Sequence, residues 1–337
     1  MVSNAVISIL ILSSTFINNA SGLRVPVSQK VQSNLRPEQL KTTTSPDDIG
    51  GFSKAKTPVG WDPNILAQEP FPQWLTDFTG LYEWPGLEPP YIPLDFIDFK
   101  KISKFPTHEQ GACPQSRDSC SYDCYKCVEP DDVYSCKKLS QSFDDGPSPA
   151  TPKLLSHLKH KTSFFTLGIN VVRFPEIYRQ VKDEGHLLGS HTWSHKYLPS
   201  LSNEEIIAQV QWSVWAMNAT GNHLPKWFRP PYGGIDNRVR SILRQFGLQS
   251  AVWDYDTFDW QLMSNQKTES EILEEVKKWK YKSNDPNGLI LEHDGSIKTV
   301  NLAVEIDNII GDDQLTVAEC AGGINYIKEF PETSHEH

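Results

Sequence analysis

The stretch that decides the fold runs from residue 288 to residue 294 and reads GLILEHD. Gly-Leu-Ile-Leu has the apolar character of a buried strand, and the polar Glu-His-Asp follows at once. Similar apolar runs occur earlier, at residues 162–167, 186–188 and 248–253, and polar clusters follow most of them. Because active sites gather at the carboxyl ends of parallel strands in α/β proteins, the stretch predicts a strand that ends in a functional loop.

Helix-like segments alternate with these strands. They cover residues 149–158, 175–183, 203–218, 237–246, 270–280 and 300–310. The sequence Ser202-Asn203-Glu204-Glu205 is typical of a helix N-terminus, since Ser and Glu three residues apart can cap each other's backbone. Repeated strand–helix units predict an α/β fold with parallel strands, either a barrel or a doubly wound sheet.

The bulk properties exclude one class of partner. The chain has 337 residues and a formal net charge of −10, enough length for one large domain with appendages or two modest ones. An acidic chain without a cluster of Lys and Arg argues against binding to the backbone of a nucleic acid. Neither length nor charge indicates an oligomeric state.

Residues 1–22, MVSNAVISILILSSTFINNASG, have the features of a secretory signal peptide. The apolar run 5–12 is too short for a membrane span, and Ala20-Ser21-Gly22 offers a cleavage site. The alternative is a buried N-terminal strand. No later segment has the ~20 apolar residues that a membrane span needs, and the polar ending KEFPETSHEH argues against a removable lipid-anchor tail. We therefore expect a secreted protein of the extracellular space or cell wall, without a membrane span.

Six cysteines fit a secreted chain. Five crowd into one segment, namely Cys113, Cys120, Cys124, Cys127 and Cys136, and Cys320 lies near the far end. The spacing Cys120-x3-Cys124-x2-Cys127 is compatible with zinc, but disulfides are the better interpretation in a secreted chain. Five clustered cysteines can pair internally only four at a time. Full oxidation within one chain therefore requires one of them to reach Cys320, which would tie the two ends of the catalytic domain together.

The tripeptide Asn218-Ala219-Thr220 is an N-glycosylation sequon. Such a sequon is used only in the secretory pathway. It predicts glycosylation at Asn218 if the chain is exported.

Two segments precede the strand–helix region. Residues 23–57 are polar, rich in Ser, Thr and Gln and without periodicity, which predicts a flexible linker. Residues 58–112 are dense in Pro and aromatic residues, too apolar for a free linker and too Pro-rich for regular helices. Their aromatic side chains either fill grooves of the main domain or, in the case of Trp61, Trp74 or Trp84, stack on sugar rings. Packing is favoured, because most aromatic residues are packing residues.

Five polar loops carry the candidate chemistry. They are SFDDGP (142–147), HTWSH (191–195), RPPYG (229–233), DTFDW (256–260) and LEHD (291–294). The spacing of His191 and His195 lets two imidazoles converge on one ion, although exposed histidines show the same spacing. A carboxylate from Asp144 or Asp145 would complete a site of two histidines and one carboxylate with an open position. A metal would also neutralise the repulsion between the adjacent aspartates.

The remaining loops offer groups for acid–base chemistry. Arg229, displayed before two prolines, can hold a carboxylate bidentately and keep it ionised. The DTFDW loop supplies Asp256, Asp259 and Trp260. His293, next to carboxylates, has a proton to give near neutral pH.

In this order the five loops resemble the five motifs of the polysaccharide deacetylases, the carbohydrate esterases of family four with a NodB-type homology domain. The resemblance runs from about residue 136 to about residue 310, and TSFFTLG at 162–168 is similar to a core strand of the family. HTWSH, RPPYG and LEHD look most like fungal chitin deacetylases. Ser142 stands where the family more often has Thr, a change that should not touch the chemistry. The resemblance implies a distorted (β/α) barrel, which we place at residues 113–330.

The resemblance also implies roles for the loop residues. Asp145, His191 and His195 would bind a divalent metal, zinc with cobalt as the alternative. Asp144 would be the general base, held by Arg229, and His293 the general acid, tuned by Asp259. Tyr232, Trp260 and Leu291 would line the pocket for the acetyl methyl, and the Tyr232 backbone N–H would donate to the oxyanion.

The activity implied by the resemblance is hydrolysis of N-acetyl groups on chitin or chitin oligomers, giving chitosan and acetate. Another acetylated glycan, such as peptidoglycan or acetylxylan, is the alternative, because the motifs alone do not exclude it. A catalytically inactive wall-binding protein usually lacks a motif residue, and here none is missing.

Overall fold

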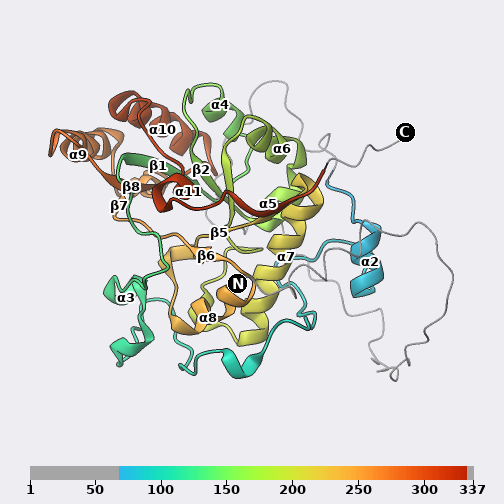
Figure 1. Ribbon diagram of the computed structural model, residues 1–337. Coiled ribbons are helices and arrows are strands. Elements are labelled where there is room, and N and C mark those ends of the chain that lie inside the picture. Colours follow the sequence, from blue (N-terminus) through green and yellow to red (C-terminus); the bar gives the residue numbers. More distant parts are fainter. Residues whose placement is uncertain (1–67, 332–337) are drawn as a thin grey trace, which may run out of the picture.

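The computed structural model describes residues 68–331, so the predicted signal peptide and linker lie outside the described residues. Seven strands, all paired in parallel, form the main sheet (Figure 1). They are β1 (Leu139–Asp144), β2 (Ser163–Thr166), β3 (Leu187–Ser190), β5 (Trp227–Phe228), β6 (Gln249–Ser250), β7 (Tyr255–Asp256) and β8 (Gly288–His293).

The strand order is that of a curled, incomplete barrel. Across the sheet it reads β6-β5-β3-β2-β1-β8-β7, so the strands follow the chain around the curl and β8 returns beside β1. A doubly wound sheet would instead reverse its order at a switch point. Among the described strands β6 and β7 are the two edges, which leaves the barrel open between them. The predicted distorted (β/α) barrel is confirmed.

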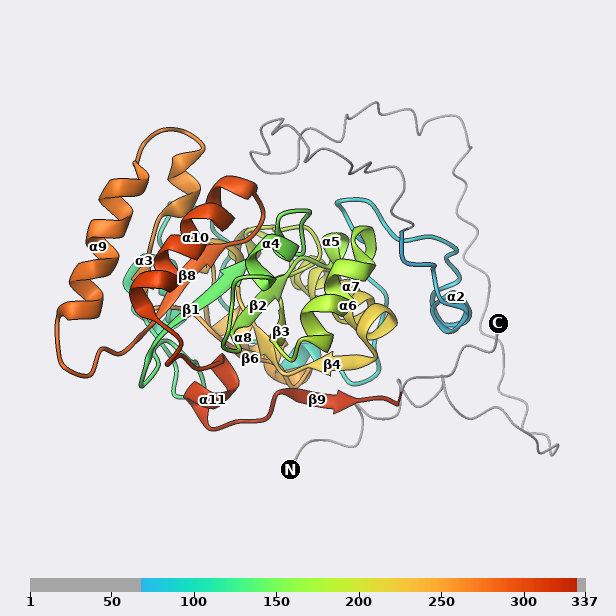
Figure 2. The same cartoon turned by 90° about the horizontal axis from the view of Figure 1, so that it is seen from above.

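Helices cover the outside of this sheet. The longer ones are α6 (Pro175–Asp183), α7 (Asn203–Gly221), α8 (Asn237–Gln245), α9 (Glu269–Tyr281) and α10 (Ile297–Ile310). The shorter helices, of which α2 and α3 lie away from the sheet, are α2 (Gln73–Thr79), α3 (Tyr122–Tyr125), α4 (Thr151–Leu155), α5 (Gly168–Arg173) and α11 (Val317–Ala321). Figure 2 shows α10, α4 and α6 along the outside of β1, β2 and β3. The six predicted helices are all present, and the Ser202–Glu205 pair forms the expected capping box at the start of α7.

The central strands are buried on both faces, as parallel strands covered by helices must be. Every residue of β1, β2 and β3 is buried. Phe143 of β1 and Phe164 of β2 stack with ring centroids 5.3 Å apart, and both belong to the main hydrophobic cluster. The register pairs Asp144 with His293, so the last residues of β1 and β8 lie side by side at the carboxyl edge of the sheet.

Strand β1 was not predicted as an apolar run, because Ser140, Gln141 and Ser142 interrupt it. These buried polar residues are satisfied by hydrogen bonds. Ser142 Oγ donates to the Ile290 carbonyl at 2.7 Å, and the Gln141 backbone N–H donates to Gln314 Oε1 at 2.7 Å. Burying a paired polar group is tolerated, so polarity alone does not mark a strand as exposed.

Other differences from the prediction concern short elements. The predicted strand at 248–253 is regular only at Gln249–Ser250, and Ala251 forms an isolated bridge with Val133. A separate antiparallel pair, β4 (His223–Pro225) with β9 (Tyr326–Glu329), was not predicted either. Both elements are too short for a periodic pattern to identify them.

The Pro- and aromatic-rich segment packs onto the barrel through its aromatic side chains. Trp84 stacks on Trp193 with centroids 6.1 Å apart and meets Trp212 edge-on at 6.3 Å. Trp74 on α2 also packs against the main cluster. The packing interpretation is confirmed for Trp74 and Trp84, whereas Trp61 lies outside the described residues.

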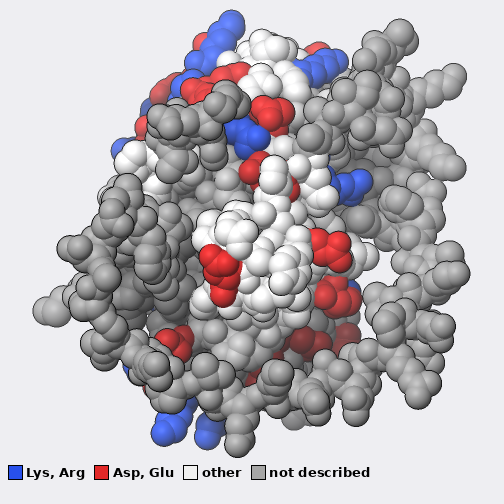
Figure 3. All heavy atoms as spheres, turned by 90° about the vertical axis from the view of Figure 1, so that its right-hand side faces the viewer, with Lys and Arg blue, Asp and Glu red and all other residues white. Residues whose placement is uncertain are grey.

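The face that carries α2 shows Asp and Glu side chains among uncharged residues in its middle (Figure 3). Exposed acidic residues of the extension include Asp77, Glu83 and Glu88.

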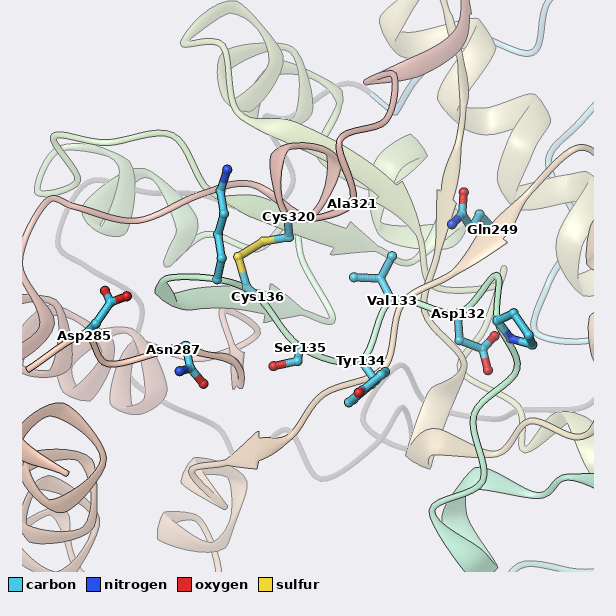
Figure 4. A pocket seen from close by; sticks show the side chains of 12 residues that line it. Asp132, Val133, Tyr134, Ser135, Cys136, Gln249, Asp285, Asn287, Cys320 and Ala321 are labelled. Atoms are coloured by element: carbon cyan, nitrogen blue, oxygen red, sulfur yellow. A yellow bond between two sulfur atoms is a disulfide. The ribbon is translucent and has the colours of Figure 1, made fainter. Parts of the chain in front are cut away.

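All six cysteines are in disulfides, which rules out the zinc interpretation of the cysteine spacing. The bonds are Cys113–Cys124, Cys120–Cys127 and Cys136–Cys320. The predicted bond to Cys320 is confirmed, and it joins residues 184 positions apart just before β1 and in α11. Cys136 and Cys320 line an open groove of about 600 Å³ together with Asp132, Gln249 and Asp285 (Figure 4). This groove contains none of the predicted site residues.

Two predictions, on membrane spans and on glycosylation at Asn218, concern residues that the structure describes. No helix within residues 68–331 is both long enough and apolar enough to cross a bilayer. Asn218 lies near the end of α7 with 9% of its surface exposed, so a glycan there would have to leave from a buried position. Glycosylation at Asn218 stays a prediction, and the fold does not favour it.

Candidate active site

The predicted site residues meet at the carboxyl edge of the sheet. Each comes from the end of a strand or from the segment that follows it, since parallel strands direct all their carboxyl ends to one edge. The contributing segments follow β1, β3, β5, β7 and β8. Residues that are more than 100 positions apart in the chain thus come into contact.

Asp145, His191 and His195 form a group with one ligand atom from each within 4.8 Å of the others. Asp145 Oδ1 lies 3.6 Å from His191 Nε2 and 3.3 Å from His195 Nε2. The second nitrogen of each ring is held from behind, because His191 Nδ1 is 2.7 Å from the Arg229 carbonyl and His195 Nδ1 is 3.1 Å from the Tyr232 hydroxyl. Such partners fix the rings so that Nε2 faces the common centre.

This group fits a divalent metal. Asp145 Oδ1 is buried and has no hydrogen-bond partner among residues 68–331. Burial, helped by the mutual repulsion of the two rings, lowers the pKa of His191 to about 3, and burial also lowers the pKa of His195. Burial would raise the pKa of Asp145, but the nearby histidines hold it below its usual value. One charged carboxylate and two neutral imidazoles are a zinc-type donor set, with room for further ligands.

The backbone of the ligand segments is strained in a way that aims the side chains. Asp145 has φ 76°, Thr192 φ 73° and His195 φ 62°, all in the left-handed region that non-glycine residues avoid. Asn170 Nδ2 donates to the Asp145 carbonyl at 2.8 Å, and the His195 N–H donates to Thr192 Oγ1 at 3.0 Å. These hydrogen bonds help to hold a conformation that the residues would not adopt alone.

Asp144 and Arg229 form a buried ion pair beside this group. Asp144 is 2% exposed and Arg229 fully buried, and Arg229 Nη1 donates to Asp144 Oδ1 at 2.9 Å. The expected bidentate contact is wrong: Arg229 Nε donates instead to the Ala251 carbonyl at 3.2 Å. Burial raises the pKa of Asp144 to about 7, although Arg229 and His293 oppose the shift.

His293 and Asp259 form the second pair. His293 Nδ1 lies 2.6 Å from Asp259 Oδ1, and Asp259 Oδ2 accepts from the His293 backbone N–H at 2.8 Å. Burial disfavours the charged imidazole, but Asp259, with Asp145 and Asp144, outweighs it and raises the pKa of His293 to about 10. Asp256 of the same loop accepts from the Phe258 backbone N–H at 2.8 Å through its Oδ1.

The three predicted pocket residues differ in exposure. Tyr232 and Trp260 are about half exposed, whereas Leu291 is 5% exposed on β8. Tyr232 has φ 61° and packs edge-on against His195 with centroids 4.5 Å apart. Trp260 follows Asp259 directly, and the backbone N–H of Trp260 donates to Asp259 Oδ1 at 2.9 Å. The two aromatic rings can therefore meet a substrate beside the proposed ligands and acid.

The Pro- and aromatic-rich segment contacts the loop that carries His191 and His195. The sequence did not indicate this contact. Trp193 Nε1 donates to the Gly86 carbonyl at 2.7 Å, and Ser194 Oγ donates to the Leu87 carbonyl at 2.6 Å. Trp193 itself is fully buried. No local pattern could predict contacts across a separation of 107 residues.

Asp294 is a further buried carboxyl next to the site, without a predicted role. Its Oδ2 accepts from Thr151 Oγ1 at 2.5 Å, and burial raises its pKa to about 7. A Cβ on Gly146 would stand 2.4 Å from Asp294 Oδ2, so only glycine fits at this position. Gly146 belongs to the SFDDGP loop that the sequence indicated as functional. The loop sequence does not show that Gly146 packs against Asp294, which lies 148 residues away.

Comparison with known proteins agrees with this geometry. A family model described as polysaccharide deacetylase matches residues 131–251. Chitin deacetylase 2 of Saccharomyces cerevisiae is 64% identical over 77% of this chain and 84% of its own length, and chitin deacetylase 1 of the same yeast is 58% identical over 78% and 87%.

Solved structures show the same fold. The chitin deacetylase from Colletotrichum lindemuthianum superposes with a TM-score of 0.53 at 27% identity, covering 62% of this chain and all of that one. A peptidoglycan N-acetylglucosamine deacetylase superposes with a TM-score of 0.51 at 28% identity, covering 58% of this chain and 95% of that one. With these relatives and this fold, the chain belongs to the polysaccharide deacetylase family.

Proposed function

We propose that the chain is a metal-dependent chitin deacetylase, which hydrolyses N-acetyl groups of N-acetylglucosamine units in chitin and releases acetate. The observation that carries the proposal is the meeting of three groups at one edge of the sheet. They are the ligand set Asp145, His191 and His195, the Asp144–Arg229 pair and the His293–Asp259 pair. The identity to two yeast proteins named chitin deacetylases supports chitin as the substrate.

Zinc is the proposed metal, with cobalt as a replacement, because imidazole and carboxylate donors in this number suit both ions. A divalent ion held by Asp145, His191 and His195 would polarise the acetamide carbonyl and make a nearby water easier to deprotonate.

Asp144 is assigned the role of general base. Its Oδ2 lies 3.7 Å from His191 Nε2, so the carboxylate borders the same space as the ligand set. It takes a proton from the water that attacks the acetyl carbon, and a pKa near neutral pH suits this task. Arg229 is a positioning residue, since its guanidinium fixes Asp144 Oδ1 and leaves Oδ2 available.

His293 is assigned the role of general acid. Because Asp259 occupies Nδ1, the proton on Nε2 is available to the departing nitrogen. The water oxygen first bonds to the carbonyl carbon and gives a tetrahedral intermediate. When this intermediate collapses, the bond from carbon to nitrogen breaks and His293 protonates the departing amine. The products are acetate and an unacetylated glucosamine unit.

The remaining groups act on the acetyl group. The Tyr232 backbone N–H is assigned to the oxyanion of the tetrahedral intermediate, and one such donor is worth about 3 kcal/mol. Tyr232, Trp260 and Leu291 are assigned to the methyl pocket. A tight apolar pocket disfavours longer acyl groups by about 1–3 kcal/mol per methylene.

The proposed place of action is outside the cell, in the extracellular space or the cell wall. Three disulfides support it, because such bonds persist in oxidising compartments.

The second candidate function is deacetylation of peptidoglycan, which the superposition on a peptidoglycan deacetylase at 28% identity keeps open. The test strips the purified protein with a chelator, reloads it with zinc or cobalt, and measures acetate released from chitin oligomers, peptidoglycan and acetylxylan. We expect the fastest release from chitin oligomers and none before reloading. Faster release from peptidoglycan would favour the second function, and no release from any polymer would exclude both.

A further inference from the structure

A second cluster of histidines and carboxylates lies at the opposite edge of the sheet. His157 and His160 stand in the segment between α4 and β2, Asp307 lies near the end of α10, and Asp312 follows that helix. His160, Asp307 and Asp312 each offer a ligand atom within 4.8 Å of the others. His160 comes three residues before β2 begins, whereas Asp144 ends β1, so this cluster and the catalytic group occupy opposite ends of the strands.

The two imidazoles approach different oxygens of one carboxylate. His157 Nε2 lies 3.3 Å from Asp307 Oδ2, and His160 Nδ1 lies 3.6 Å from Asp307 Oδ1. These distances match those between neighbouring ligands around a tetrahedral zinc ion, roughly 3.3 Å for bond lengths of about 2.0 Å. They are longer than hydrogen bonds.

His160 has no hydrogen-bond partner in the described part of the chain, at either ring nitrogen. Its side chain is only 5% exposed, and that of Asp307 is equally buried. Buried polar groups are normally paired, so an imidazole with two unpaired nitrogens calls for an explanation. A simple ion pair between His157 and Asp307 leaves His160 unexplained.

The carboxylate is held by a second layer of polar groups. Gln314 Nε2 donates to Asp307 Oδ1 at 3.1 Å and to Gln141 Oε1 at 2.9 Å. Gln141 is anchored on β1, where its Nε2 donates to the Ala303 carbonyl at 3.2 Å. Groups behind a ligand that fix its orientation are typical of metal sites.

We propose that His160, Asp307 and Asp312 form a second, structural zinc site, with His157 beside the same carboxylate. One neutral imidazole and two carboxylates supply three ligands, and the two negative charges balance the ion. The burial of His160 and Asp307 restricts access of a substrate, so the site would bind metal without catalysing a reaction. It would join the segment before β2 to the end of α10.

The neighbouring cations do not occupy the cluster. Lys159 and Lys161 are exposed, and the Lys161 ammonium donates to the Glu184 carbonyl. Their charges lie close enough to weaken cation binding somewhat, so the site depends on its two carboxylates.

The test counts bound zinc in the whole protein after chelation, reloading and removal of excess metal. His160→Gln should lose one equivalent relative to the unchanged protein. Asp145→Asn combined with His195→Gln removes the proposed catalytic site and should also lose one equivalent but keep the other. Because each site is counted separately, failure of the catalytic proposal does not affect the count at His160.

Two variants guard against misfolding and non-specific effects. Asp312→Asn alters an exposed residue and should weaken the second equivalent at least tenfold without unfolding the chain. His108→Gln is the matched control, because it also removes a histidine that lies near a carboxylate, Asp123. His108 Nε2 lies 3.1 Å from the Tyr197 hydroxyl, so we expect no metal there and an unchanged number of zinc ions per protein.

Thermal unfolding gives a readout independent of activity. Zinc should raise the melting temperature of the Asp145→Asn/His195→Gln protein, because an ion that binds only the folded state stabilises it. The shift should disappear when His160→Gln is added. Equal zinc counts in the unchanged protein and the His160→Gln variant, or no thermal shift in the catalytic-site variant, would overturn the proposal.

Discussion

The two edges of the sheet carry similar side chains in different settings. At the carboxyl edge, Asp145 and His195 keep about a quarter of their side-chain surface exposed, and two buried acid–base pairs stand beside them. At the amino edge, His160 and Asp307 are almost fully buried, and glutamines back them. The group at the carboxyl edge is partly exposed to water and has a carboxylate beside it that can act as a base, so it is suited to catalysis. The group at the amino edge has neither property and is suited only to binding. The following predictions test this division between chemistry at one edge and stability at the other.

The largest expected effect is on the rate. Asp144→Asn should lower the rate of acetate release by about 10³-fold, since it removes the proposed general base. The amide is nearly isosteric and can still accept from Arg229, so the zinc content should stay unchanged. Acetate release and metal analysis of the same sample check both points.

Asp145→Asn is the matched control for that prediction. The Asp145→Asn variant should bind zinc more weakly than the unchanged protein. It should regain part of its activity at high zinc concentration. If Asp144→Asn loses zinc while Asp145→Asn keeps it, the assigned roles of the two aspartates are reversed.

At the amino edge the Cys136–Cys320 bond should affect stability alone. Replacing both residues by Ser should lower the free energy of unfolding by about 3–5 kcal/mol, because the bond closes a long loop of the unfolded chain. Chemical denaturation measures the change, and acetate release per folded molecule should not alter. Replacing Cys113 and Cys124, only 11 positions apart, should have a smaller effect on unfolding. An equal or larger effect there would contradict the loop-length argument.

The pH profile should respond to the partner of the general acid. As the proposed general acid, His293 must be protonated to act, so activity should be lost as the pH rises through its pKa of about 10. Asp259→Asn removes the main group that raises this pKa, and the alkaline limb should move to lower pH by about 1–3 units. The pH dependence of kcat/KM measures the shift. An unchanged alkaline limb would assign that limb to another group.

The smallest expected effect concerns the support of the histidine loop. Trp193→Phe keeps the aromatic packing but removes the hydrogen bond to the Gly86 carbonyl, which should lower the free energy of unfolding by about 1 kcal/mol. Zinc affinity should fall slightly with it, because Trp193 lies between the two histidines that are proposed as metal ligands. A loss of activity as large as that of Asp144→Asn would show that the loop, and not the base, limits the chemistry.

The sequence was most informative where polar residues follow an apolar strand. That pattern identified the loops of His191 and His293, because sheet geometry sends them to one edge whatever the details of packing. It did not identify β1, whose Ser and Gln side chains are paired only in the folded state. The single hydrogen bond between Arg229 and Asp144 also depends on side-chain placement that no motif specifies.

The sequence also could not predict which residues far apart in the chain come into contact. One cysteine partner of Cys320 could be predicted by counting, but its identity as Cys136 could not. His160 and Asp307 lie in unrelated segments, and only the packing of α10 against α4 brings them together. Neither residue belongs to a recognisable motif.

The bond from Trp193 to Gly86 has a consequence for how this protein can be divided. A polypeptide beginning at residue 113 would hold every motif residue, yet Trp193 would lose both the Gly86 carbonyl that accepts from its indole N–H and its stacking partner Trp84. The shortest autonomous folding unit should therefore begin before residue 84, well ahead of the family match at residue 131. A boundary drawn at residue 112 separates the catalytic loops from a segment that acts as part of their scaffold.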